Sequence, residues 1–252
     1  RARGGPALAG PLAGGGRHRR RLRGGMTEAV LFDVDFTLIY PGRTFQGEGY
    51  AGFCRAHGID VDPARFDAAV AAALPLLEVP DHRYSDDLFV RYTRTIIEGM
   101  GGQGPALDAC AREMYDEWAL CHHFHLYDDA EPVLRQLARG GLKIGLVSNS
   151  HRSLDAFRTH FGLADVISVA VSSSDHGYLK PHPSIFRAAL DALGARAEHA
   201  VMVGDSVSHD IEGALGVGMR GVLIQRHGAA PPVGMRADVP VISGLAGLLS
   251  WI

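Results

Sequence analysis

Two carboxylates stand close together immediately after the first apolar run of the chain. Asp33 and Asp35 follow Ala29–Phe32 and are separated by one residue. If the strand geometry persists through this segment, both side chains lie on the same side. Like charges at that distance are unfavourable unless a cation, or a split between their pKa values, relieves the repulsion. A divalent metal with separate nucleophile and acid roles would satisfy both carboxylates, and a pair of loop acids that cap a helix is the alternative.

A hydroxyl, an amide and a lysine occur in two later segments. Ser148 and Asn149 end the apolar run Gly145–Val147, and they can donate hydrogen bonds to phosphate oxygens or cap a helix. Lys180 is one of only two lysines in the chain, the other being Lys143. A lysine in this position suits a site that needs a compact ammonium group, and a solvated surface lysine is the alternative.

Two further acidic residues follow a later apolar run. Asp205 comes after Ala200–Val203, where it can complete an oxygen-rich site of the kind that Mg²⁺ prefers. Asp210 lies further on, in the expected helix. It can support the metal ligands or compensate the helix dipole. Together, the hydroxyl, ammonium and carboxylate groups form a set suited to phosphoryl transfer.

The elements between these residues predict an α/β fold. Short runs rich in valine, isoleucine and leucine suit strands buried on both faces, and most connections have room for a crossover helix. We therefore expect a doubly wound parallel sheet, in which ligands bind beyond the carboxyl ends of the strands. The expected strands are Ala29–Phe32, Ile144–Val147, Val166–Val171, Ala200–Val203 and Val222–Ile224.

The long gap between Phe32 and Ile144 predicts an all-helical insertion. Asp62 precedes a proline, as an N-cap does before proline at the first helical position, and Ser85 can cap another helix. Apolar residues at spacings of three and four continue these helices. We expect helices near 45–57, from 62, from 85 and over 107–121, and we place the insertion at 41–127 and the core at 26–40 and 128–252.

This ordered set of polar residues resembles the four motifs of the haloacid dehalogenase-like (HAD) hydrolase superfamily, in phosphatase-type members with a helical (C1-type) cap. The resemblance implies a Rossmann-like core, a cap at 41–127, and Mg²⁺-dependent hydrolysis of small phosphomonoesters through an aspartyl-phosphate. The motifs here are Asp33-x-Asp35-x-Thr37, Ser148-Asn149, Lys180-Pro181 and Gly204-Asp205-x-x-x-x-Asp210.

The resemblance also implies a role for each matching residue. Asp33 would attack phosphorus, and Asp35 would protonate the leaving oxygen and then deprotonate the hydrolytic water. Lys180 would also offset charge in the transition state. The phosphate-binding set would be Thr37, which steadies the first loop, with Ser148, Asn149 and Lys180, and the Mg²⁺ ligands would be Asp33, the backbone carbonyl of Asp35, Asp205 and Asp210.

Other activities remain open within and outside this family. Asp35 argues against haloacid dehalogenation, which needs no acid at that position. The absence of lysine between residues 41 and 127 leaves no candidate for a Schiff base from the cap. A phosphosugar mutase and a catalytically idle binding or scaffold protein are the alternatives to a phosphatase. The substrate can be a phosphorylated sugar, a short acid such as phosphoglycolate, or a nucleoside monophosphate, and Phe36, where these enzymes often have glycine, bears on its fit.

Three other patterns have simpler interpretations. Gly216–Gly221 matches G-x-G-x-x-G, but it runs from a helix end into a strand, the reverse of the order in a dinucleotide site. Cys121–His125 contains sulfur and imidazole groups that can bind a transition metal. We interpret this segment as the end of a helix and the hinge between insertion and core. His209 can approach the substrate, and an exposed loop histidine is the alternative.

Composition limits the partners. The 252 residues carry a net charge of −3, and since residues 1–25 contain seven arginines and no acid, residues 26–252 carry −10. This acidic body argues against nucleic acid or an anionic membrane as the main partner. No apolar run is long enough to span a bilayer. The three cysteines show no C-x-x-C spacing, which suits reduced thiols and a cytoplasmic location.

The first 25 residues differ from the rest of the chain. They contain eight glycines and no apolar periodicity, so we expect a disordered tail, or sequence upstream of a start at Met26. A transit peptide and a nucleic-acid-binding arm are the alternatives. The oligomeric state stays open, because an apolar stripe on a helix can face a core or another subunit.

Overall fold

The structure is a computed structural model, and it describes residues 26–226 and 236–252. The tail expected at residues 1–25 lies outside the described residues. In the part of the chain that is described, no helix has both the length and the apolar character needed to cross a membrane.

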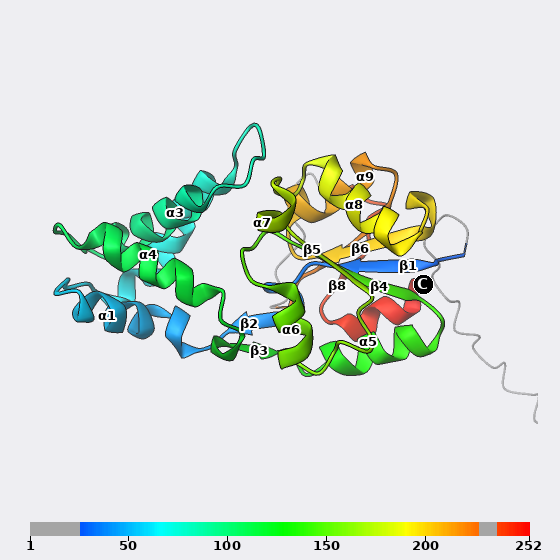
Figure 1. Ribbon diagram of the computed structural model, residues 1–252, viewed down its shortest axis with the longest axis horizontal. Helices are drawn as coiled ribbons and strands as arrows, with labels where there is room; N and C mark the ends of the chain where they lie inside the picture. Colours follow the sequence, from blue (N-terminus) through cyan, green and yellow to red (C-terminus); the bar gives the residue numbers. More distant parts are fainter. Residues whose placement is uncertain (1–25, 227–235) are drawn as a thin grey trace, which may run out of the picture.

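A six-stranded parallel sheet forms the core (Figure 1), in the order β5-β4-β1-β6-β7-β8. The chain begins in the middle with β1, moves outward through β4 and β5, and then crosses back to β6 and continues to the other edge. This confirms the predicted doubly wound α/β fold. The strands are β1 (Ala29–Phe32), β4 (Lys143–Ser148), β5 (Val169–Ser172), β6 (Ala200–Gly204), β7 (Arg220–Ile224) and β8 (Val241–Ile242).

Helices cover both faces of the sheet, and alternate residues of β1 face the two layers. Val30 and Phe32 pack with apolar side chains of α5 and α6, whereas Ala29 and Leu31 pack with those of α8. Figure 1 shows these two layers on opposite sides of the strands. The core helices are α5 (Ala130–Arg139), α6 (Leu154–His160), α7 (Ser173–His176), α8 (Pro183–Leu193) and α9 (Gly213–Gly216), with 3₁₀ helices η5 (Ala197–His199) and η7 (Leu245–Ser250) and the π-helix η6 (Val207–Glu212).

Four α helices in the segment 42–123 lie apart from the sheet, on the left of Figure 1. α3 packs against both α2 and α4. A short antiparallel pair, β2 (Ile39–Pro41) with β3 (Phe124–Leu126), joins this helical cap to the core. The cap contains α1 (Gly47–Ala56), α2 (Phe66–Ala73), α3 (Asp86–Gly99) and α4 (Leu107–Trp118), with 3₁₀ turns η1 (Arg43–Phe45), η2 (Pro63–Arg65), η3 (Leu74–Leu77) and η4 (Cys121–His123).

The structure corrects some expected element boundaries. The strand expected at Val166–Val171 begins only at Val169, because the backbone carbonyl of Leu163 accepts hydrogen bonds from Val166 and Ile167 and holds them in a turn. The Asp62 side chain accepts from the Ala64 amide as a cap should, at 3.0 Å. Ser85 precedes α3 as expected, but its side chain makes no capping hydrogen bond. The short strands β2, β3 and β8 were not expected.

Candidate active site

The loop after β1 turns sharply and presents two carboxylates at the carboxyl edge of the sheet. The backbone carbonyl of Val34 accepts hydrogen bonds from Leu38 and Ile39, which closes the turn. Asp33 is 7% exposed, and the Asp35 side chain is 18% exposed. Both therefore belong to a largely dehydrated site in which electrostatic interactions are strong.

Arg226 supports this loop from the side of β7. Its guanidinium donates to the backbone carbonyl of Thr37 at 2.6 and 3.0 Å and to the Asp129 carboxylate at 2.9 Å. It also lies 3.6 Å from the ring centre of Tyr127. The arginine thus fixes the backbone at Thr37. The Thr37 hydroxyl takes no part in these contacts and is available to other groups.

Lys180 connects two of the predicted acidic residues. Its ammonium group donates to Asp33 and to Asp210 at 2.6 Å each, and the residue is only 2% exposed. Burial lowers the pKa of Lys180, but the charges of Asp210 and Asp33 outweigh it and leave this pKa above its usual value. The lysine is therefore a permanent cation in the site, and the solvated alternative is excluded.

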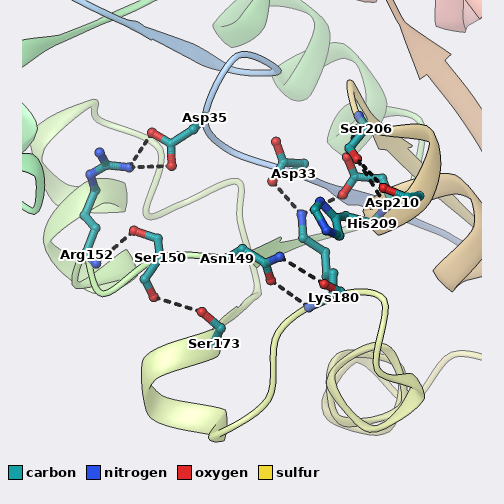
Figure 2. Close-up of polar contacts among 11 residues, drawn as sticks. Asp33, Asp35, Asn149, Ser150, Arg152, Ser173, Lys180, Ser206, His209 and Asp210 are labelled. Atoms are coloured by element: carbon teal, nitrogen blue, oxygen red, sulfur yellow. Dashed lines mark hydrogen bonds and ion pairs between the residues drawn. The ribbon is translucent and has the colours of Figure 1, made fainter. Parts of the chain in front are cut away.

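The Asn149 side chain holds Lys180 in place rather than pointing at a ligand (Figure 2). Its amide nitrogen donates to the Lys180 carbonyl at 3.1 Å, and its oxygen accepts from the Lys180 amide at 2.7 Å. The loops after β4 and β5 are tied together in this way. Because both polar atoms of the Asn149 side chain are used in this way, a contact between Asn149 and phosphate would come from its backbone.

Three carboxylates converge beside this lysine. Oxygens of Asp33, Asp205 and Asp210 lie within 4.8 Å of one another. Burial raises the pKa of Asp33 to about 6, and loss of hydration together with the charges of Asp33 and Asp210 raises the pKa of Asp205 to about 8. Crowded carboxylates of this kind fit a hard divalent cation such as Mg²⁺, since the cation removes their repulsion.

Asp210 is held more firmly than the other two carboxylates. One of its oxygens accepts from Lys180 and the other from the Ser206 amide at 3.0 Å. A Cβ on Gly204 would lie 2.2 Å from the Asp210 carboxyl group, so the glycine allows this close approach. The arrangement favours a supporting role for Asp210, with Asp33 and Asp205 presenting the more accessible oxygens.

Two buried hydroxyls at this edge lack partners among the described residues. Ser148 Oγ, at the end of β4, and Thr37 Oγ1 make no hydrogen bond there, and the residues are 1% and 0% exposed. A buried hydroxyl without a partner is costly, so such groups in a native site usually await a ligand or water. Both residues belong to the predicted phosphate-binding set.

Arg152 is a site residue that the sequence did not indicate. It is fully buried, and one guanidinium nitrogen donates to both oxygens of Asp35 at 3.0 and 3.1 Å. The other donates to the Trp118 carbonyl at the end of α4, at 2.9 Å. Burial raises the pKa of Asp35, and the Arg152 charge opposes that rise. Its position just after Ser148-Asn149 was the only available signal.

A second contact between cap and core lies on the far side of the site. The His82 carbonyl accepts from the Leu179 amide at 2.7 Å, and the Tyr84 amide donates to the Gly177 carbonyl at 3.1 Å. His209 lies under this loop, with its Nε2 3.5 Å from Glu78. The cap therefore contacts the segment that carries Lys180, and His209 faces the cap rather than open solvent.

A cavity of about 460 Å³ lies between cap and core. At the core it is bounded by Asp35, Phe36 and Asn149, and the cap supplies most of the remaining wall. A substrate group placed here would extend from the catalytic edge into the helical cap.

Of the two other sequence patterns, the glycine-rich one is not a dinucleotide site, whereas ligand atoms of His122, His123 and Glu117 lie within 4.8 Å of one another, close enough to hold a metal ion. Gly216 ends α9 and β7 begins at Arg220, so G-x-G-x-x-G does run from helix to strand. In Cys121–His125, only His122 and His123 gather with a third group, Glu117, which pairs with His123 at 2.6 Å. The segment forms η4 and β3, as expected of a hinge.

Comparisons with known proteins agree on one family. Residues 27–218 match the haloacid dehalogenase-like hydrolases. The chain is 31% identical to haloacid dehalogenase-like hydrolase domain-containing protein 3 of Danio rerio, over 78% of this chain and 84% of the relative. It is 30% identical to phosphoserine phosphatase of Thermus thermophilus, over 85% and 92%. The crystal structure of a HAD phosphatase from Thermococcus onnurineus superimposes with a TM-score of 0.63 at 27% identity, covering 88% of this chain and 96% of that one.

Proposed function

The chain belongs to the haloacid dehalogenase-like hydrolases, and we propose that it is a Mg²⁺-dependent phosphatase that hydrolyses small phosphomonoesters through an aspartyl-phosphate. One observation carries the proposal: Asp33, buried at the carboxyl end of the central strand, is bonded to Lys180 and stands beside Asp205 and Asp210. A nucleophile, a fixed cation and a carboxylate cluster are the groups that phosphoryl transfer requires.

Asp33 acts as the nucleophile. Burial raises the pKa of its carboxyl to about 6, so the group is ionised at neutral pH and poorly hydrated. A carboxylate oxygen attacks phosphorus, the bond between phosphorus and the alcohol oxygen breaks, and the phosphoryl group passes to Asp33. Lys180, 2.6 Å from Asp33, lies where it offsets the charge on the transferring phosphoryl oxygens.

Asp35 serves as general acid and then as general base. It protonates the leaving alcohol oxygen in the first step and deprotonates the water that releases phosphate in the second. Burial raises the pKa of Asp35, which favours the protonated form that the first step needs. Arg152 holds both carboxylate oxygens and thereby sets the orientation of the acid.

Mg²⁺ would be held by Asp33 and Asp205, with the Asp35 backbone carbonyl as a further ligand and Asp210 in support. When bound, the ion neutralises charge on the phosphoryl oxygens and on the carboxylates. The hydroxyls of Ser148 and Thr37, which have no partner among the described residues, would donate hydrogen bonds to phosphate oxygens at the same edge. A catalytically idle binding or scaffold protein is the competing function, and the presence of Asp33, Asp35 and Asp205 argues against it.

The test is phosphate release by the full chain from a panel of phosphomonoesters, with Mg²⁺ and with chelator. We expect release with Mg²⁺ only, and its loss in Asp33→Asn. Asp191→Asn, an exposed substitution on α8, is the matched control and should keep full activity. Mass spectrometry of the quenched reaction should find phosphate on the peptide that contains Asp33. Release by Asp33→Asn at the wild-type rate would exclude the mechanism.

A further inference from the structure

We propose that the alcohol part of the substrate is apolar and uncharged, an alkyl or aryl-alkyl group that fills the cavity between cap and core. This inference rests on the proposed phosphatase function and adds the class of substrate. The cavity adjoins Asp35, the residue that would protonate the leaving oxygen. The group attached to that oxygen therefore enters this cavity, whose chemistry selects the substrate.

The cavity wall is mostly hydrocarbon. Helices α2, α3 and α4 supply most of its aliphatic and aromatic side chains, and β2 and α1 contribute Pro41 and Tyr50. Matching apolar surface to apolar surface is the main source of affinity in such a pocket. The apolar lining side chains in the middle of the cap include Phe66, Val70, Phe89, Ile96, Met114 and Trp118.

No lysine or arginine is among the residues that line the cavity, all of which lie in the described part of the chain. The one candidate cation is His151, whose ring stacks on Tyr115 with centroids 3.8 Å apart. Burial lowers the pKa of His151, so its imidazole is neutral at neutral pH. The Asp67 carboxylate on the wall would repel a second negative charge, and Asp35 is already paired with Arg152.

A substrate with an anionic or strongly hydrated tail therefore fits poorly. An anionic tail would lose water without meeting a lysine or arginine on a wall that is mostly apolar, and that loss is costly. This argues against phosphoglycolate and nucleoside monophosphates, which the sequence had left open.

Phe36 gives independent support from its backbone. It has φ of +62°, a left-handed conformation that is rare for a bulky residue and that glycine would adopt without strain. Its side chain lines the cavity next to Asp35 and is still 46% exposed, so burial in the core does not explain its presence. An aromatic ring in this strained position is best explained by contact with an apolar substrate group.

The first measurement compares kcat/KM of the full chain on primary alcohol phosphates with similar leaving groups. We expect n-hexyl phosphate and 2-phenylethyl phosphate to exceed glycerol 3-phosphate and phosphoglycolate by about tenfold or more, because each buried methylene contributes about fourfold. Turnover of the charged or hydroxylated substrates at an equal or higher kcat/KM would overturn the inference and leave the phosphatase function standing.

Substitutions then test whether the residues of the cavity determine the substrate preference. Leu74, at the rim, is 51% exposed, so Leu74→Arg should fold and should shift the preference toward phosphoglycolate by about tenfold. Leu120→Arg is the matched control, because Leu120 is 40% exposed and outside the cavity, and it should leave the preference unchanged. Phe36→Gly should reduce the preference for hexyl phosphate without lowering the melting temperature.

Binding of phosphonates separates this inference from the proposed function, since it requires no turnover. In calorimetric titrations with Mg²⁺, benzylphosphonate should bind the wild-type chain at least about tenfold more tightly than 3-phosphonopropionate. Tighter binding of 3-phosphonopropionate would refute the apolar substrate. If the apolar phosphonate binds more tightly but no phosphate ester is hydrolysed, the cavity assignment stands and the phosphatase proposal fails.

Discussion

Replacing Arg152 by glutamine should weaken both the fold and the chemistry. The substitution removes the charge-assisted contact with Asp35, at 3.0 and 3.1 Å, and the hydrogen bond to the Trp118 carbonyl, at 2.9 Å. Breaking a buried ion pair costs about 3–5 kcal/mol, because one charge stays buried without its partner. The Asp35 side chain is 18% exposed, so water compensates part of that loss. We therefore expect the lower end of the range, about 3 kcal/mol of unfolding free energy.

Urea denaturation measures this loss, and a double-mutant cycle with Asp35→Asn isolates the pair. A charge-assisted hydrogen bond contributes about 1.5–3 kcal/mol, so we expect a coupling energy near 2 kcal/mol between the two positions. Arg158→Gln is the matched control. Arg158 donates to the Ile167 carbonyl at 2.9 Å in the core, away from the catalytic loop.

Activity separates a positioning role of Arg152 from a purely structural one. A misoriented Asp35 should slow hydrolysis of alkyl phosphates, whose leaving oxygen needs a proton, much more than hydrolysis of 4-nitrophenyl phosphate. Arg158→Gln should lower stability without changing that ratio. If Arg152→Gln shows no coupling to Asp35 and slows both substrates equally, the assignment of Arg152 as the residue that orients the acid is wrong.

Three further predictions concern the carboxylate cluster and the cavity. Gly204→Ala should lower kcat/KM about a hundredfold, because its Cβ would lie 2.2 Å from the Asp210 carboxyl group, whereas Gly216→Ala meets nothing within 4 Å and should be neutral. In chelator, the melting temperature should fall as pH rises from about 4 and level off near 8, because the unfolded chain gives up this proton at the ordinary aspartate pKa whereas the folded state raises the pKa of Asp205 to about 8. Mg²⁺ should reverse this fall, and Asp205→Asn should abolish both the fall and the response to Mg²⁺. Because burial lowers the pKa of His151, the unfolded chain takes up the proton more readily below pH 6.5, and stability should decline there. His151→Phe should make that decline, measured by thermal unfolding between pH 8 and pH 5, smaller.

The central strands of the fold could be predicted because their signal is local. β1, β4, β6 and β7 are buried on both faces, and such strands appear in a sequence as short uninterrupted apolar runs. β2, β3 and β8 have only two or three residues each, too few to produce a period. The hinge between cap and core was therefore predicted from its position at the end of the helical insertion, and not from the strands that form it.

The site was predictable as far as it depends on strand ends. Asp33, Ser148 and Asp205 follow buried strands, and parallel strands bring their carboxyl ends to one edge. Arg152 depends instead on a contact with Asp35 across 117 positions of sequence. An arginine after a strand end is usually solvated, and only the position of the cap shows that this one is buried.

The charges at the edge of the sheet explain why the buried ion pairs form two separate groups, one around Asp35 and one around Asp33. Arg152 is paired with the Asp35 carboxylate on the side of the cap, whereas Lys180 is paired with Asp33 and Asp210. Lys180 balances only part of the charge of Asp33, Asp205 and Asp210 when all three are ionised. A divalent cation would supply the remaining positive charge, and without it an incoming phosphate dianion would meet a negatively charged site. If the proposed apolar alcohol group fills the cavity, it would keep water from screening these charges, so metal, phosphate and apolar group would reinforce one another's binding.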